Sequence, residues 1–303
     1  MTLLFAGIDG GQSSTTAVVG DQTGRILGCG TAGAADEIGV GKESTRLRDA
    51  LHGALFEACA AAGLTSGTQF ESIVAGVSGY DGRVYGRAAE LPARRSLLLH
   101  DTPIAHAGAL SGRAGAIAIA GTGSVVYGTN EDGWSITLGG WGFLFGDEGS
   151  AFAIVRDALA LLMRAQDDGD NALAAQAHEV CDFFGMDSLR RLAHAFYKGG
   201  IARDRLASFA PQALRFAAFR TLAERGADRI AHLLCRAVAA GAAPRVALVG
   251  GVFADEGLQR RVRAGVLQAC AQAEFVEPRY EPACGALLLA YREGGQTVTE
   301  LRW

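Results

Sequence analysis

Two loops rich in glycine and hydroxyl residues are the segments of this sequence best suited to bind phosphate. The first, residues 9–15, reads Asp-Gly-Gly-Gln-Ser-Ser-Thr, and the second, residues 121–124, reads Gly-Thr-Gly-Ser. Small side chains leave backbone N–H groups open, and such groups together with hydroxyls are the donors that hold phosphate oxygens. The candidate phosphate contacts are Gly10, Gly11, Gln12, Ser13, Ser14, Thr15, Gly121, Thr122, Gly123 and Ser124.

Both loops lie in the same local pattern, which predicts a duplicated scaffold. In each copy an apolar run precedes the loop, a second run follows it, and a turn ending in Gly24 or Gly133 leads to a third run. These are signals for strands joined by tight turns. One such loop alone is equally well read as an ordinary β-turn. Two symmetric loops favour a nucleotide held across a cleft between two lobes.

Two carboxylates stand where predicted strands end. Asp9 opens the first loop and could place a metal-associated carboxylate beside the phosphate donors. Asp101 follows the predicted strand 96–100, at the end of the strand where open α/β sheets bind ligands. Because Thr102-Pro103 is typical of a helix start, Asp101 also fits a helix cap. The two roles are compatible.

Two further glycine-rich segments suggest binding sites for flat ligands. Residues 139–150 combine glycines with Trp141 and end in Asp147-Glu-Gly-Ser, which suits a sugar that needs an apolar surface and carboxylate acceptors. The alternative is that these acidic residues only stabilise a helix N-terminus. Gly250 and Gly251 follow a predicted strand and would let the backbone approach adenine or ribose, or would allow close packing of helix on strand.

The remaining pattern predicts an α/β fold. Helices are expected over 43–62, after Gly82, over 256–271 and over 284–291, and strands over 72–77, 96–100, 245–249 and near 275–276. Residues 149–240 are alanine-rich and helical in character. Strands that alternate with helices are typical of α/β architecture.

Composition narrows the class of protein. The 303 residues are 49% hydrophobic and 20% charged, and the net charge of −4 without a basic block argues against nucleic acid as the main partner. No two of the six cysteines have C-x-x-C spacing, which favours free thiols in a reducing cytoplasm. No signal peptide or membrane span is evident, so we expect a cytoplasmic protein without a membrane partner.

These segments, in this order, resemble the sugar kinase/hsp70/actin superfamily. Within it they resemble the BadF/BadG/BcrA/BcrD ATPase family, which combines N-acetylglucosamine kinases, glucosamine kinases and ATPase subunits of benzoyl-CoA reductase. The string Gly-Gly-Trp-Gly…Gly-Asp-Glu-Gly-Ser over 139–150 is specific to that family. The resemblance implies two ribonuclease H-like (actin-like ATPase) lobes with a central cleft, over 1–112 and 113–289, with the second lobe enlarged by helices. A final helix at about 290–303 can pack back on the first lobe.

The resemblance also implies a function and its residues. It suggests an ATP-dependent kinase acting on the 6-hydroxyl of an amino sugar, N-acetylglucosamine or glucosamine, with Asp101 as general base and Mg²⁺ held by Asp9 through water. The segment 248–254 resembles the adenosine motif, with Gly250, Gly251, Val252 and Ala254 as ATP contacts. The sugar contacts would be Asp36, Ser78, Asp101, Thr122, Trp141, Gly142 and Asp147.

Two departures from the family pattern bear on specificity. Gln12-Ser13 replaces the usual Gly-Thr of the first loop, and Asp36 replaces the usual Asn. A carboxylate cannot donate to an acetyl carbonyl but pairs well with an ammonium group, so glucosamine becomes a real alternative substrate.

The resemblance leaves other roles and assemblies open. The alternatives to a kinase are an ATPase subunit or activator of a CoA-ester reductase or dehydratase, and a non-catalytic sugar sensor. Such a sensor would carry a DNA-binding domain ahead of Asp9, so the sequence favours an enzyme. Family members are commonly dimers, so a homodimer is one expected assembly.

Overall fold

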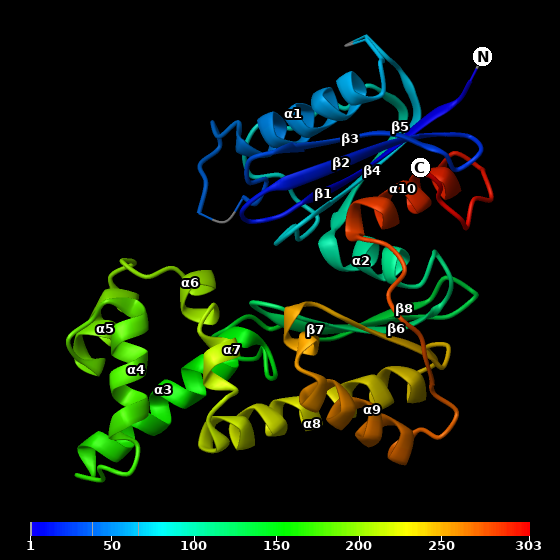
Figure 1. Cartoon of the computed structure of the whole chain (residues 1–303). Helices are drawn as coiled ribbons and strands as arrows, with labels where there is room; N and C mark the ends of the chain where they lie inside the picture. Colours follow the sequence, from blue (N-terminus) through cyan, green and yellow to red (C-terminus); the bar gives the residue numbers. More distant parts are fainter. Residues whose placement is uncertain (1, 38, 66) are drawn as a thin grey trace. The chain divides into compact units, whose positions relative to one another are not determined.

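The computed structural model describes residues 2–37, 39–65 and 67–303 (Figure 1). The chain forms two compact units, one made of Met1–Ala114 with Glu277–Trp303 and the other of Gly115–Val276. The chain therefore returns to the first unit at Glu277, earlier than the predicted lobe boundary at 289. That boundary falls inside the last helix, α10 (Pro282–Glu293).

The first unit is built on a five-stranded mixed sheet with the order β3-β2-β1-β4-β5. β1 pairs antiparallel with β2, which pairs antiparallel with β3, and β4 and β5 follow in parallel. The strands are β1 (Leu4–Gly10), β2 (Thr15–Asp21), β3 (Ile26–Ala32), β4 (Phe70–Val77) and β5 (Ala93–His100).

Helices cover both faces of this sheet, because successive strand side chains point to opposite sides. Ala6 and Ile8 of β1 share a core with α1 (Arg46–Ala61), whereas Phe5 shares a core with α10. α2 (Asp101–Ala109) packs against α10. At Gly7 a Cβ atom would lie 2.1 Å from the backbone nitrogen of Leu287, so only glycine lets α10 approach β1 this closely.

The second unit repeats this topology in the order β10-β9-β6-β7-β8. β6 to β8 form an antiparallel meander, and β9 and β10 add in parallel. The strands are β6 (Gly115–Ala120), β7 (Ser124–Thr129), β8 (Ser135–Gly139), β9 (Arg245–Val249) and β10 (Glu274–Phe275). The predicted α/β fold with a duplicated scaffold is confirmed.

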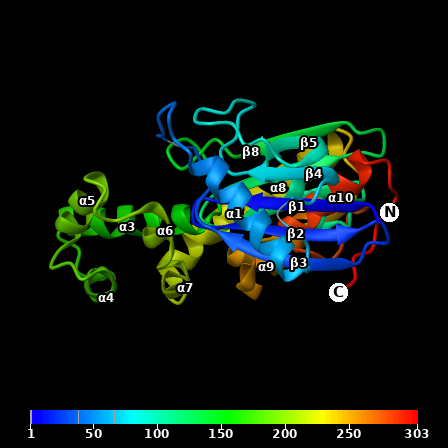
Figure 2. The same cartoon turned by 90° about the horizontal axis from the view of Figure 1, so that it is seen from above.

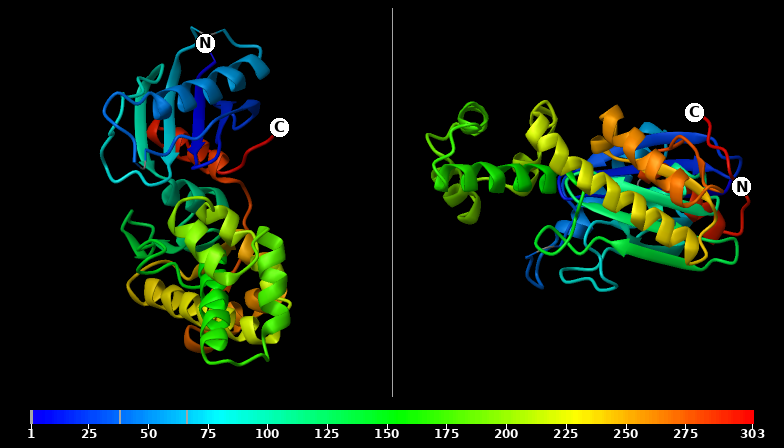
Figure 3. Two further views of the ribbon diagram at one scale, coloured as in Figure 1. Left: turned by 90° about the vertical axis from the view of Figure 1, so that its left-hand side faces the viewer. Right: turned by 90° about the horizontal axis from the view of Figure 1, so that it is seen from below.

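Helices inserted between β8 and β9 enlarge the second unit. They are α3 (Ala151–Asp167), α4 (Ala174–Phe184), α5 (Leu189–Tyr197), α6 (Arg203–Ala207), α7 (Ala210–Ala213) and α8 (Ala217–Ala239). α8 packs against β6 and β7, and α4 and α5 lie at the end of α3 that is remote from the sheet (Figures 2 and 3). The 3₁₀ turn η1 (Gly251–Ala254) and α9 (Glu256–Ala269) follow β9.

The predicted helix after Gly82 is wrong. Residues 78–92, all of them described, contain turns and bends but no helix. Glu37 holds this segment from far away in the sequence, because its carboxylate accepts hydrogen bonds from the backbone N–H groups of Tyr85 at 2.9 Å and Gly86 at 2.7 Å. Beyond the first turn of a helix, these N–H groups would donate to backbone carbonyls and could not bind Glu37. Among the described residues, no helix is both long and apolar enough to span a bilayer.

Candidate active site

The carboxyl ends of β1, β4 and β5 meet at one edge of the first sheet. Gly10 is the register partner of Val77, and Val77 is the partner of His100. The Ser78 N–H donates to the Gly10 carbonyl at 2.8 Å. This row places the ends of three strands side by side. Asp9 precedes the row on β1, whereas Ser78 and Asp101 follow it on β4 and β5.

Asp101 is the first residue of α2, and its side chain is about one-third exposed. Its Oδ1 lies 2.7 Å from Nδ1 of His100. Burial by itself would raise the pKa of this carboxyl. Hydrogen bonds from His100, Ser78 and Thr102, with the imidazole charge, outweigh burial and lower that pKa below its usual value. The helix N-terminus favours the same charged form. The carboxylate is therefore ionised at neutral pH.

Asp9 has the opposite electrostatic environment. Burial, the negative charge of Asp101 and the negative charge of Glu281 together raise its pKa to about 6. None of the described residues donates a hydrogen bond to its carboxylate or forms an ion pair with it. Because Asp9 lies near the carboxylates of Asp101 and Glu281, a positively charged group bound there would be stabilised.

The first glycine loop forms a tight turn in which the Gly11 N–H donates to the Ser14 carbonyl at 2.9 Å. Gln12, Ser13 and Ser14 are exposed at its tip. Thr15 differs from them, since it is fully buried and its hydroxyl donates to the Gly33 carbonyl at 2.7 Å. Its side chain holds the loop in place, and the tip residues present the open donors.

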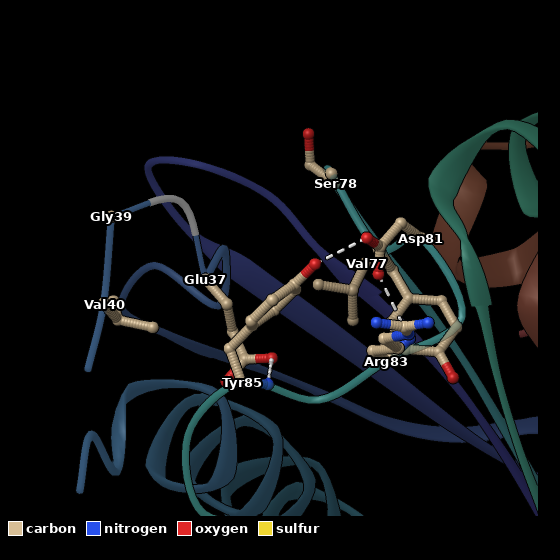
Figure 4. A pocket seen from close by; sticks show the side chains of 10 residues that line it. Glu37, Gly39, Val40, Val77, Ser78, Asp81, Arg83 and Tyr85 are labelled. Carbon is tan, nitrogen blue, oxygen red and sulfur yellow. Dashed lines mark hydrogen bonds between the residues drawn. The ribbon is translucent and has the colours of Figure 1, made fainter. Parts of the chain in front are cut away.

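A cavity of about 280 Å³ lies in the first unit, beside the irregular segment after β4 (Figure 4). Its side-chain walls include Tyr85 and Asp81, joined by a hydrogen bond from the Tyr85 hydroxyl to Asp81 Oδ2 at 2.6 Å. Of the predicted sugar contacts only Ser78 lines this cavity. Sequence reasoning missed the rest of its wall, because it assigned Arg83 and Tyr85 to a helix. It also had no signal that Glu37 and Val40 approach the end of β4. The lining residues are Glu37, Gly39, Val40, Val77, Ser78, Gly79, Tyr80, Asp81, Arg83 and Tyr85.

Asp36 lies outside the residues that line this cavity. It is buried, and its Oδ1 is 3.5 Å from Nη1 of Arg46, which is also 3.5 Å from the Asp36 carbonyl oxygen. No sequence signal predicts this pairing, since Arg46 stands in the predicted helix with no motif around it. The charge that Asp36 presents to a ligand is therefore shared with a guanidinium group.

In the second unit the glycine loop 121–124 packs against Asp147. Asp147 is buried with a left-handed φ of 59°, and a Cβ on Gly123 would lie 2.9 Å from its Oδ2. Burial raises the Asp147 pKa, although the Ser124 N–H donates a hydrogen bond to its carboxylate. The Ser124 hydroxyl donates to the Glu148 carbonyl at 2.8 Å. The structure thus joins the second phosphate motif to the predicted sugar motif.

Trp141 leaves most of its ring open, with 76% of the residue exposed. Gly142 follows it with a φ of 81°, a left-handed conformation that favours glycine. The flat apolar face that the sequence suggested is thus available on the second unit.

The second loop and Gly251, which follows β9, line one cavity of about 500 Å³. Gly250 has a φ of 108°, and a Cβ there would lie 2.4 Å from the Ala120 carbonyl oxygen, so glycine is required. One wall comes from α6 and α7, which carried no motif. The lining residues are Gly121, Thr122, Ala151, Ile154, Asp204, Ala207, Ser208, Ala210, Pro211, Leu214, Gly251, Val252, Ala254 and Asp255.

Residues 6–290 match the model of the BadF/BadG/BcrA/BcrD ATPase family. The chain belongs to this family. No curated protein shows a significant match to it. Membership of an ATPase family implies that ATP is the nucleotide used.

Solved structures resemble this family member over nearly all of their length. A protein provisionally named an N-acetylglucosamine kinase, from Chromobacterium violaceum, is 26% identical with a TM-score of 0.73, and the match covers 95% of this chain and 99% of that one. A similarly named protein from Porphyromonas gingivalis is 17% identical with a TM-score of 0.65, covering 96% and 99%. The ROK hexokinase from Thermus thermophilus is 19% identical with a TM-score of 0.57, covering 97% and 100%. The last two show the shared fold.

The residues that could hold ATP differ from those that could hold Mg²⁺. Gly121 and Thr122 of the second loop line the same cavity as Gly251, so one unit offers ATP both a cavity and nearby phosphate donors. Among the described residues no group of three or more His, Cys, Asp or Glu side chains could hold a metal ion alone. Mg²⁺ usually binds through one or two carboxylates, water and substrate phosphates, and the half-buried Asp9 can supply one such carboxylate.

Proposed function

We propose that this protein is an ATP-dependent kinase that phosphorylates the 6-hydroxyl of an amino sugar, N-acetylglucosamine or glucosamine. The observation that carries the proposal is the ionised Asp101 at the end of β5, next to Ser78 and within the electrostatic reach of Asp9. The kinase names of the Chromobacterium and Porphyromonas proteins support the same assignment.

Asp101 is proposed as the general base. Its carboxylate takes the proton of the sugar hydroxyl as that oxygen attacks the γ-phosphorus. The bond from the γ-phosphorus to the bridging oxygen breaks, and ADP leaves with the electron pair. A carboxylate of low pKa is a weak base, which suits a loose transition state in which positioning and electrostatic stabilisation matter most.

The other residues are proposed to bind and orient the two substrates. The N–H groups and hydroxyls of both glycine loops hold the phosphates, and the cavity at Gly251 holds the adenosine. Asp9 would hold Mg²⁺ through water, and the bound ion would supply positive charge beside the phosphates. The exposed face of Trp141 packs against the sugar ring, since it is flat and open. The sugar contacts carried over from the family are Asp36, Ser78, Thr122, Gly142 and Asp147.

A coupled assay of ADP release tests the proposal. The purified protein is given ATP, Mg²⁺ and, in turn, each member of a panel of hexoses and amino sugars, and the product is identified by mass spectrometry. ADP release that depends on an amino sugar, and yields its 6-phosphate, supports the proposal. ATP hydrolysis that no sugar stimulates, together with iron in the purified protein, would instead favour an ATPase that activates a CoA-ester reductase or dehydratase.

A further inference from the structure

Asp101 accepts a hydrogen bond from the residue that precedes it, in addition to one from the Ser78 side chain. Nδ1 of His100 lies 2.7 Å from Oδ1 of Asp101, and Thr102 Oγ1 is 3.4 Å from the same oxygen. His100 and Thr102 therefore both contact Oδ1. Oδ2 has neither of these two partners. About half of the His100 side chain and one-third of the Asp101 side chain are exposed, so the pair borders solvent rather than the core.

His100 also has a purely structural role at the start of α2. It is the N-cap of α2, and its Nδ1 lies 3.2 Å from the backbone nitrogen of Thr102. One ring nitrogen cannot donate to Asp101 and accept from Thr102 at the same time. The 2.7 Å distance is that of a charge-assisted bond, whereas 3.2 Å is at the long end of the range for a neutral bond. The geometry thus favours Nδ1 as the donor.

We propose that His100 is a positioning residue for phosphoryl transfer, donating from Nδ1 to Oδ1 of Asp101 and so turning Oδ2 toward the substrate hydroxyl. This inference rests on the proposed kinase function, since it assigns a partner to the base of that reaction. A carboxylate that can rotate about its Cβ–Cγ bond offers the substrate either oxygen in many orientations. A fixed partner on one oxygen holds the other at a constant angle, which is a contribution to orientation rather than to bond making.

The charges around this pair agree with such a role. Asp9 of β1 interacts electrostatically with Asp101, and Glu281, just before α10, adds negative charge near Asp9. The cations Arg94 and Arg95 of β5 pair with Glu71 near the start of β4, at the opposite end of these strands. His106, buried in α2, is the other titratable group on the helix. His100 is thus the imidazole in direct contact with the base, and its own pKa is raised by the bond to Asp101.

Two substitutions separate orientation from charge. His100→Ala removes the donor, whereas His100→Asn keeps an amide donor and a favourable helix cap but carries no positive charge. With the amino sugar that the ADP-release panel identifies, we expect His100→Ala to lower kcat by about 10- to 100-fold, the effect of one hydrogen bond to a charged group. KM for sugar and for ATP should change less than about twofold, because uniform substrate binding is untouched.

The asparagine variant and a matched control complete the experiment. His100→Asn should recover most of kcat, and the acid limb of its kcat/KM profile should move to higher pH because Asp101 loses a neighbouring cation. His178→Ala removes an exposed His–Asp pair of α4, in which Nε2 lies 3.3 Å from Asp182 Oδ2. That control should leave kcat and the pH profile unchanged.

The result that would overturn the inference is equally specific. If both His100 variants keep full kcat, or if alanine and asparagine lower kcat and the melting temperature in parallel with an unmoved pH profile, His100 only caps α2. A readout without turnover is the ¹⁵N spectrum of the His100 ring, in which Nδ1 should lose its hydrogen-bonded shift in the Asp101→Ala variant. A wild-type protein that phosphorylates no sugar would refute the kinase assignment, while this spectrum would still report the pair.

Discussion

The two sheets share one topology but differ in chemistry at corresponding strand ends. In the first unit β1 carries Asp9 near its end, β4 is followed by Ser78 and β5 by Asp101. In the second unit β6 ends in Ala120 and β9 is followed by Gly250, which touches the Ala120 backbone. The strand ends of the first unit thus bring two carboxylates together, whereas those of the second unit bring two backbone segments into close contact. The comparison suggests that the first unit provides the residues for proton transfer and the second unit provides the cavity for the nucleotide.

Asp101→Asn tests the role assigned to the first unit and should have the largest effect. The amide has the same shape but cannot take a proton, so kcat should fall by about two to four orders of magnitude. Sugar and ATP affinities, measured by calorimetry, should stay within a few-fold of the wild type. A variant that keeps most of its turnover would leave Asp101 as a helix cap only.

Gly250→Ala tests the role assigned to the second unit. An alanine Cβ would lie 2.4 Å from the Ala120 carbonyl oxygen, at a φ of 108° that L-residues avoid. We expect a loss of stability of about 2 kcal/mol or more, with weaker ATP binding because the cavity wall moves. Gly251→Ala is the matched control for stability, since nothing lies within 4 Å of a Cβ at that position. Thermal unfolding of the two variants should differ clearly, and equal melting temperatures would contradict the close contact.

The sequence was sufficient for features that depend on neighbours in the chain. The strand before Asp101 and the helix start after it were visible in an apolar run followed by Thr102-Pro103. The predicted elements around both glycine loops, and the strand 245–249, correspond to β1, β2, β6, β7 and β9. The family resemblance is confirmed by the match over residues 6–290.

What could not be predicted depends on contacts between distant segments. The segment after Gly82 is irregular because Glu37 takes up its N–H groups, and no local pattern reports that. The return of the chain at Glu277 follows from the contact of α10 with Gly7 of β1. The wall that α6 and α7 give to the cavity beside Gly251 likewise depends on tertiary packing. The roles of the site residues remain predictions until the variants are measured.

Asp9→Asn sharpens the comparison through pH. The folded-state pKa of Asp9 is about 6, above the usual 3.8, so the folded protein binds this proton more tightly than the unfolded chain. Stability from this group is therefore present below the unfolded pKa and is lost as pH rises through 6. Without ligands, Asp9→Asn should stabilise the protein at pH 8 by on the order of 2 kcal/mol and have little effect at pH 4. The same variant should lose Mg²⁺-dependent activity.

Asp21→Asn is the control with the opposite sign. Hydrogen bonds from Thr23 and from the Arg25 backbone outweigh burial and lower the pKa of Asp21. Its stabilisation is therefore present above the unfolded pKa and is lost as pH falls through the folded one. Asp21→Asn should destabilise the protein at neutral pH and become neutral in acid. If the change in melting temperature relative to the wild type follows pH in the same direction for both variants, the opposite pKa shifts assigned to Asp9 and Asp21 are wrong.

The smallest expected effect concerns the substituent on sugar carbon 2. With its full charge, a carboxylate at Asp36 would favour a cationic amine by roughly ten- to a hundredfold. The structure pairs this carboxylate with Arg46 at 3.5 Å, which offsets part of its charge. We therefore expect a preference for glucosamine of about tenfold or less, the lower end for a charge-assisted hydrogen bond. Asp36→Asn should lower kcat/KM for glucosamine and raise it for N-acetylglucosamine.

Arg46→Gln tests the same interaction from the other side. Removing the guanidinium restores the full charge of Asp36, so the ratio of kcat/KM for glucosamine to that for N-acetylglucosamine should rise by about two- to fivefold, as for a half-exposed ion pair. In the double variant with Asp36→Asn this gain should vanish, because the two effects act through one contact. If Asp36 binds a sugar hydroxyl instead, Asp36→Asn will lower both activities together and Arg46→Gln will leave their ratio unchanged. That outcome would remove amine recognition and leave the kinase assignment standing.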